Sequence, residues 1–171
     1  MRIFLIGFMG SGKSFTGKKL AARIGRPFLD LDEWIETRSR STISEIFTRH
    51  GEEAFRRLES NILREMNQFP TAVIACGGGT PCYADNMNWM NANGKTIFLD
   101  VSEQILVDRL TPEADHRPIL QTGHPIEQIV KEKLATRRKF YEKAHLHLRS
   151  DNPEGDFARL IAEQLATLGS N

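Results

Sequence analysis

Residues 7–14 of this chain read GFMGSGKS, in which glycines, a lysine and a hydroxyl residue follow an apolar run. The spacing fits the pattern G-x-x-x-x-G-K-[ST] without a departure. Glycines allow successive backbone N–H groups to turn toward one anion, and a helix starting here would add its positive N-terminal end. Lys13 would then reach the β- and γ-phosphates of a nucleotide, and the Ser14 hydroxyl would bind Mg²⁺. The competing interpretation is a glycine-rich strand-to-helix turn that binds nothing.

Two carboxylates stand close together in the segment FLDLDEW, where Asp30 and Asp32 lie at the expected end of a strand. The two-residue period of a strand would place both on one side, facing the crevice at the carboxyl edge of a parallel sheet. One carboxylate would help to hold Mg²⁺ and its waters, and the other would accept a hydroxyl proton or orient an acceptor. The alternative is that one of them caps a helix and the other is merely solvated.

Two arginines interrupt apolar stripes of expected helices. One stripe passes through Leu134 and continues on three- and four-residue steps to Arg137 and Tyr141. A guanidinium on an inward-facing stripe is costly unless an anion meets it, and its planar fork suits a carboxylate or a phosphate. Arg56 lies three residues before Glu59, so ligand binding competes there with an ordinary surface ion pair.

Two further segments have the composition of ligand-binding loops. Three glycines, residues 77–79 of CGGGTP, follow an apolar strand-like run, and there they would let a ligand approach bare backbone. Taken alone, a triple glycine is equally consistent with a simple turn.

Residues 111–123 form the longest irregular stretch, which we interpret as a mobile lid. Arg117 in this stretch would neutralise charge on a transferring phosphoryl group.

The elements that must position these residues alternate between strand-like and helix-like patterns. Apolar runs predict strands at 2–6, 27–29, 71–75, 96–100 and 145–148. Apolar periodicity predicts helices at 13–24, 32–38, 43–48, 52–68, 84–93, 102–110, 125–144 and 153–168. This alternation indicates a doubly wound α/β fold with a mostly five-stranded parallel sheet flanked by helices, in one domain spanning 1–171.

The composition excludes several classes of protein. The net charge is +1, from 23 basic and 22 acidic residues, so no general field favours nucleic acid or a membrane surface as a partner. No apolar run approaches the length of a membrane span, and a cytoplasmic protein is expected.

Cys76 and Cys82 match neither a disulfide framework nor a zinc site, and the five histidines show no metal spacing. No asparagine precedes a lysine, which argues against a GTPase with a guanine-reading Asn-Lys-x-Asp motif.

In order along the chain, the phosphate loop, FLDLDEWIE, ISEIF, GEEAFRRLE, CGGGTP, RPIL and RRKFYEKAHL resemble shikimate kinases. The resemblance implies a P-loop NTPase fold of the NMP-kinase-like class, working as a monomer. It implies ATP-dependent phosphorylation of the 3-hydroxyl of shikimate, the fifth step of the route to chorismate and the aromatic amino acids. It also implies a substrate-binding segment at 32–60 and a lid at 111–123.

The resemblance assigns roles to residues at matching positions. The catalytic residues it implies are Lys13, Asp32 and Arg117. The ATP site would comprise Gly10, Ser11, Gly12, Lys13, Ser14, Phe15, Arg109, Arg117 and Pro153, with Mg²⁺ held by Ser14 and Asp30. The shikimate site would comprise Asp32, Phe47, Phe55, Arg56, Glu59, Gly77, Gly78, Gly79 and Arg137.

Two departures from the family pattern stand out. Arg40 occupies a position before ISEIF where the family usually has glycine, and RRKFY replaces the usual R-x-P-L-Y. The second departure leaves Arg138 as an alternative to Arg137, although helical phase favours Arg137. Two other functions stay open at this point: a related gluconate-type kinase, and a nucleotide-binding regulatory module without turnover.

Overall fold

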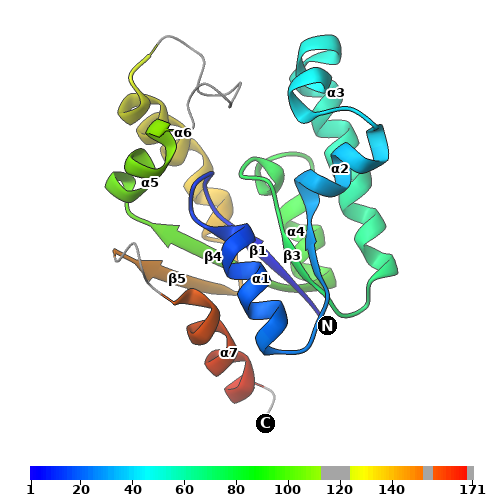
Figure 1. Cartoon of the computed structure of the whole chain (residues 1–171), viewed down its shortest axis with the longest axis vertical. Helices are drawn as coiled ribbons and strands as arrows, with labels where there is room; N and C mark the ends of the chain where they lie inside the picture. Colours follow the sequence, from blue (N-terminus) through cyan, green and yellow to red (C-terminus); the bar gives the residue numbers. More distant parts are fainter. Residues whose placement is uncertain (113–123, 152–155, 169–171) are drawn as a thin grey trace.

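The computed structural model describes residues 1–112, 124–151 and 156–168 of the chain. Five parallel strands form one sheet in the order β2-β3-β1-β4-β5 (Figure 1). Their bounds are β1 (Arg2–Ile6), β2 (Phe28–Asp30), β3 (Val73–Ala75), β4 (Gly94–Val101) and β5 (Leu146–Ser150). The sheet confirms the predicted five-stranded parallel α/β architecture.

Strand β1 occupies the middle of the sheet because it is apolar on both faces. Ile3, Phe4, Leu5 and Ile6 have no exposed surface, as expected where helices cover both sides of a strand. β1 pairs with β3 on one side and with β4 on the other. The carboxyl ends of neighbouring strands therefore meet at one edge of the sheet.

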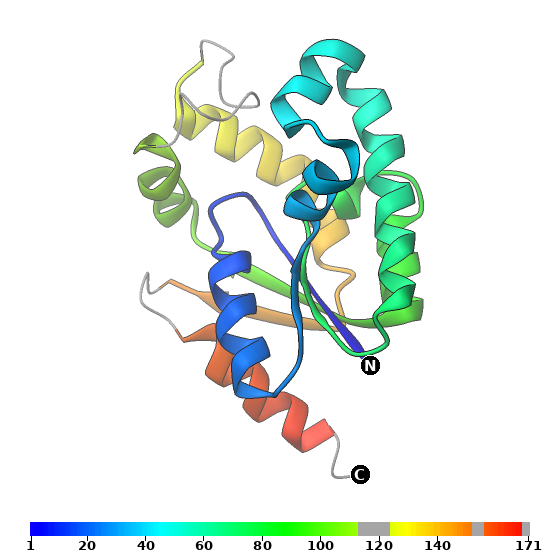
Figure 2. The same ribbon diagram turned by 45° about the vertical axis from the view of Figure 1, so that its right-hand side comes forward.

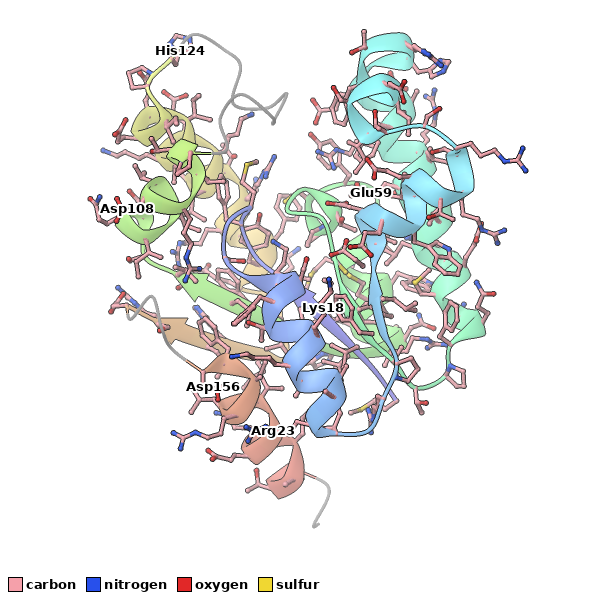
Figure 3. The ribbon with its side chains drawn as sticks, viewed as in Figure 1. Lys18, Arg23, Glu59, Asp108, His124 and Asp156 are labelled. Carbon is pink, nitrogen blue, oxygen red and sulfur yellow. The ribbon has the colours of Figure 1, made fainter. Side chains whose placement is uncertain are left out.

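Helices cover both faces of this sheet. They are α1 (Lys13–Arg23), α2 (Leu31–Ser39), α3 (Ile43–Glu65), α4 (Asn86–Asn93), α5 (Glu103–Leu110), α6 (Ile126–Tyr141) and α7 (Phe157–Leu168), with short 3-10 turns η1 (Met66–Gln68) and η2 (Thr80–Cys82). Figure 2 shows α1 and α7 together on one face, with α6 on the other. Arg23 and Asp156, labelled in Figure 3, join α1 to the start of α7 with 3.9 Å between NH2 and Oδ2.

Helix α3 is divided at Gly51. Gly51 has φ 78° and ψ 172°, which are not helical, so the chain turns sharply inside the element. The predicted division into helices 43–48 and 52–68 reflects this break, because only glycine adopts such a conformation readily. The first half begins with a capping box, in which Thr42 and Glu45 satisfy each other's backbone N–H groups.

The remaining boundaries differ from the predicted ones by a few residues. α7 begins at Phe157 instead of 153, and residues 152–155 lie outside the described part of the chain. Residues 80–82, before the predicted helix 84–93, form the turn η2, and α4 begins at Asn86. Within the described residues, no helix is both long enough and apolar enough to cross a membrane.

Helix α2 ends at Arg40, where the family pattern usually has glycine. Arg40 is exposed and adopts a left-handed conformation with φ 52° and ψ 35°. A side chain in this conformation costs about 1–2 kcal/mol, whereas glycine adopts it without strain. The chain therefore keeps the backbone turn without the residue that suits it best.

We expect Arg40→Gly to raise the free energy of unfolding by about 0.5–1 kcal/mol, since part of the relieved strain is offset by a more flexible unfolded chain. Urea denaturation followed by circular dichroism measures the change. Arg57→Gly is the matched control, because Arg57 is an exposed arginine in the helical part of α3. That substitution should lower the free energy of unfolding by about 1 kcal/mol. Destabilisation by both substitutions would contradict the interpretation of Arg40.

Candidate active site

A cleft of about 1500 Å³ opens at the carboxyl edge of the sheet. In Figure 1, α2 and α3 stand on one side of this edge and α5 and α6 on the other. Every predicted site residue that the structure describes lines the cleft. These residues are Gly10, Ser11, Gly12, Lys13, Ser14, Phe15, Asp30, Asp32, Phe47, Phe55, Arg56, Glu59, Gly77, Gly78, Gly79, Arg109 and Arg137. Arg117 and Pro153 lie outside the described residues, as does most of the predicted lid.

The loop between β1 and α1 has the backbone of an anion-binding turn. Gly10 and Gly12 have φ values of 78° and 86°, and Gly12 caps the N-terminus of α1. The Lys13 ammonium donates to the Phe8 carbonyl oxygen at 2.8 Å, which lays the side chain back over the loop. The Arg109 guanidinium donates to the Gly10 carbonyl oxygen at 3.0 Å. Two cations and the N-terminus of a helix therefore converge on one small region.

Asp30 links the end of β2 to this loop. Its Oδ2 accepts a hydrogen bond from the Ser14 hydroxyl at 2.5 Å, while its Oδ1 accepts from the backbone N–H of Asp32 at 3.0 Å. Asp30 thus caps α2, as one of the two interpretations predicted, and its other oxygen meets the Ser14 hydroxyl. The argument from strand period was wrong for Asp32, because the strand ends at Asp30 and Asp32 lies in the first turn of α2.

Asp32 is the carboxylate with the most perturbed environment in the cleft. Burial raises its pKa to about 6, and the negative charges of Asp30 and Glu59 contribute to the rise against the opposing effects of Lys13 and Arg56. A carboxylate with this pKa is ionised at neutral pH and is a better proton acceptor than an ordinary aspartate.

Arg56 and Glu59 form an ion pair that is buried. Their side chains are 7% and 1% exposed, and Arg56 NH1 lies 2.9 Å from Glu59 Oε2. The other oxygen of Glu59 accepts from the Thr80 hydroxyl at 2.6 Å. The alternative considered for this pair was correct in its i,i+3 pairing but wrong in its surface position, because both side chains are buried. Figure 3 places Glu59 on the inner side of α3, where it holds the guanidinium at the cleft wall.

The three glycines after β3 form a wall on which side chains lie directly. A Cβ added to Gly77 would stand 2.8 Å from Asp32 Oδ1, and one added to Gly79 would stand 2.5 Å from Arg56 NH2. A Cβ at Gly78 would stand 3.1 Å from the backbone nitrogen of Met9. Only glycine permits all these approaches, so the wall brings the acidic and basic groups of the cleft close together.

Arg137 and its neighbour Arg138 point to different partners. Arg137 is 8% exposed, and its NH1 has no hydrogen-bond partner within the described residues. Arg138 instead makes a bidentate pair with Asp100 on β4, at 3.0 Å to each oxygen. A buried guanidinium with an unsatisfied donor at a cleft wall is arranged to meet an anionic ligand. This geometry favours Arg137 over Arg138 as the ligand-binding arginine.

A family model for shikimate kinase matches residues 9–166 of the chain. The chain belongs to the shikimate kinase family. A shikimate kinase from Parabacteroides distasonis is 44% identical over 147 residues, which is 85% of each chain. One from Bacteroides thetaiotaomicron is 44% identical over 156 residues, covering 90% of this chain and 89% of that protein.

Solved structures of shikimate kinases share the whole fold. The Bacteroides thetaiotaomicron structure has a TM-score of 0.87 and 39% identity, and the match covers 100% of this chain and 99% of that one. A shikimate kinase from Acinetobacter baumannii in complex with shikimate has a TM-score of 0.91 and 32% identity, with coverage of 99% and 95%. The enzyme is therefore a phosphotransferase with the P-loop, NMP-kinase-like fold that the sequence predicted, and ATP is its co-substrate.

Two side chains that support the site were given no role in the sequence analysis. Thr80 is fully buried and donates to Glu59, and the Tyr141 hydroxyl donates to the Gly78 carbonyl oxygen at 2.5 Å. Tyr141 was identified as part of an apolar stripe and as the tyrosine that matches the family's R-x-P-L-Y pattern, but no contact was assigned to it. Its spacing of four residues from Arg137 was the available signal, because it places both on one face of α6.

Proposed function

We propose that this enzyme transfers the γ-phosphoryl group of ATP to the 3-hydroxyl of shikimate, with Asp32 as the proton acceptor and Arg56 and Arg137 as the carboxylate-binding pair. The observation that carries the proposal is the position of Asp32. It lines the same cleft as the phosphate loop and as the two buried guanidinium groups, one of which has an unsatisfied donor. An acceptor anchored by its carboxylate would thus present a hydroxyl between a base and the nucleotide.

At the donor end, the loop amides and Lys13 are proposed to bind the β- and γ-phosphates. Ser14 and Asp30 supply two adjacent hard oxygen ligands, which suit Mg²⁺ that also binds nucleotide phosphates and water. Among the described residues, no group of three or more His, Cys, Asp or Glu side chains is arranged so that it could hold a metal ion. When bound, Mg²⁺ would neutralise charge on the transferring group.

At the acceptor end, Arg56 and Arg137 are proposed to orient shikimate through its carboxylate. Glu59 fixes Arg56, and the glycine wall allows the ring to lie close to backbone. Phe47 and Phe55 pack with ring centroids 4.6 Å apart and ring planes tilted by 37°, and they form an apolar floor beside these charges. Asp32 then accepts the hydroxyl proton as the oxygen attacks phosphorus. Positioning and electrostatics supply most of the rate in this type of reaction.

The resemblance to shikimate kinases supplies the proposed substrate-binding segment, the lid and the adenine contacts. We propose that residues 32–60 form the shikimate-binding segment and that 111–123 close over the site, with Arg117 neutralising phosphoryl charge. Arg109 and Pro153 are proposed to contact adenine. Arg109 lines the cleft together with Phe15 and Phe157. These two aromatic side chains support the assignment of this part of the cleft to the adenine base.

A coupled assay of ADP release tests the proposal against the gluconate-type alternative. With ATP and Mg²⁺ in excess, shikimate should support saturable ADP release, and gluconate and nucleoside monophosphates should give rates at the level of ATP hydrolysis without acceptor. Mass spectrometry of the product should show one added phosphate on shikimate. Faster turnover with gluconate than with shikimate would overturn the proposed substrate.

A further inference from the structure

The Arg56 guanidinium is packed against the glycine wall and against aromatic rings. A Cβ added to Gly79 would lie 2.5–2.6 Å from NH2, Cζ and NH1, so the Gly79 backbone packs closely against the group. The centroid of the Tyr83 ring lies 4.4 Å from Arg56 Cζ. The centroid of the Phe55 ring lies 5.1 Å from the same atom. The guanidinium is therefore packed against the Gly79 backbone and against two aromatic rings.

A second carboxylate fixes the Tyr83 ring in this position. The Tyr83 hydroxyl donates to Glu52 Oε1 at 2.9 Å, and the same oxygen lies 3.2 Å from Arg56 NH2. Glu52 is half-exposed, and it is absent from the lining of the cleft. The contacts of Tyr83 and Glu52 thus hold Arg56 from outside the cleft, whereas Glu59 holds it from within the protein.

Arg56 lies between two surface hollows. It lines both the main cleft and a groove of about 310 Å³ on the outside, and Tyr83 lines only the outer groove. Without the Tyr83 ring, the outer groove would extend further over the guanidinium. The residue that follows, Ala84, has φ 46°, a conformation that alanine rarely adopts. This strained backbone turns the chain directly after Tyr83 presents its ring to Arg56.

We propose that Tyr83 is a positioning residue for the acceptor carboxylate. This rests on the proposed function, in which Arg56 binds that carboxylate. The Tyr83 ring and the Gly79 backbone restrict the movement of the guanidinium, so that its cleft-facing N–H groups are already oriented when shikimate arrives. The contribution appears in acceptor binding, because Tyr83 touches neither the nucleotide loop nor Asp32.

The test compares two substitutions that remove different parts of the side chain. Tyr83→Leu removes the ring and should raise the KM for shikimate by about 3- to 30-fold, in line with a lost cation–π contact. Tyr83→Phe keeps the ring and should change this KM by no more than about 3-fold, in line with one hydrogen bond at an exposed site. The KM for ATP should stay unchanged in both variants.

The carboxamide of shikimate distinguishes positioning from a general structural effect. It lacks the charge that Arg56 is proposed to bind, so Tyr83→Leu should leave its KM unchanged. Phe140→Leu is the matched control, because Phe140 also carries lysine cations near its ring, at 5.3 and 5.6 Å, but does not line the cleft. It should alter neither KM.

The outcomes separate this inference from the proposed function. If the native enzyme turns over the carboxamide as well as shikimate, the carboxylate role of Arg56 fails, and the role of Tyr83 fails with it. If the native enzyme discriminates but Tyr83→Leu behaves like the native chain, only the inference about Tyr83 is overturned. Equal losses with both acceptors would show a structural role and would also overturn it.

Discussion

Asp32→Asn is expected to lower kcat by about two orders of magnitude or more, because the amide accepts no proton from the attacking hydroxyl. Binding of ATP should be retained, since the loop amides and Lys13 that are proposed to bind the phosphates stay in place. Steady-state kinetics with shikimate, together with calorimetric titration of an unreactive ATP analogue, measure both quantities. Near-normal turnover would show that Asp32 is not the base.

The pKa of Asp32 also predicts how the native enzyme responds to pH. Only the ionised carboxylate accepts a proton, so kcat/KM should rise with pH up to a pKa of about 6 and then level off. In Asp32→Asn this inflection should disappear from the residual activity. A profile with the same inflection in both proteins would assign it to another group.

The same substitution should stabilise the fold at neutral pH. The pKa of Asp32 is higher in the folded protein than its ordinary value of 3.8, so folded-state stability is greatest when the group is protonated and is lost as pH rises through about 6. The neutral amide introduced by Asp32→Asn would avoid this loss, which amounts to about 2–3 kcal/mol. Thermal melts should therefore show a stabilised variant above pH 7 and a difference that vanishes below pH 4. A constant difference across this range would argue against an ionised Asp32 with a raised pKa.

The sheet and most helices were predictable because their residues carry the signal locally. The run around Phe4 is apolar on both faces, which only a strand in the middle of a covered sheet explains. The breaks also have local causes, as at Gly51. Arg40 shows the limit, because nothing in its side chain indicates a left-handed turn, and only the resemblance to a family glycine pointed to it.

The site was predictable as a set of residues but not as a set of contacts. Asp30 and Asp32 were placed together correctly, yet a strand period cannot show that the helix begins between them. The burial of the Arg56–Glu59 pair depends on Thr80 and on the glycine wall, which are more than 15 residues away along the chain. Such contacts follow from the tertiary fold, and no pattern along the chain contains them.

Arg137→Ala is expected to weaken shikimate binding by about 2–5 kcal/mol, the usual cost of removing one partner of a buried charge pair. The KM for shikimate should rise by about 30-fold or more, while the KM for ATP changes little. The cost to the fold should be smaller than the cost to binding, because NH1 has no hydrogen-bond partner to lose within the described residues, although the contact of the guanidinium with the Phe8 ring, 5.5 Å away, is removed. Kinetics and a thermal melt on the same preparation measure both effects.

Arg138→Ala provides the matched control one residue away on α6. Arg138 makes a bidentate pair with Asp100. His147 Nε2 lies 2.9 Å from Oδ2 of the same carboxylate. Removing Arg138 should therefore lower the melting temperature and leave the KM for shikimate within about 3-fold of the native value, since the lost contact lies away from the cleft. The reverse pattern, with a raised KM in Arg138→Ala and a normal one in Arg137→Ala, would show that the two arginines exchange roles when substrate binds. The two neighbours thus separate ligand binding from fold stability, because α6 directs one guanidinium into the cleft and the other onto β4.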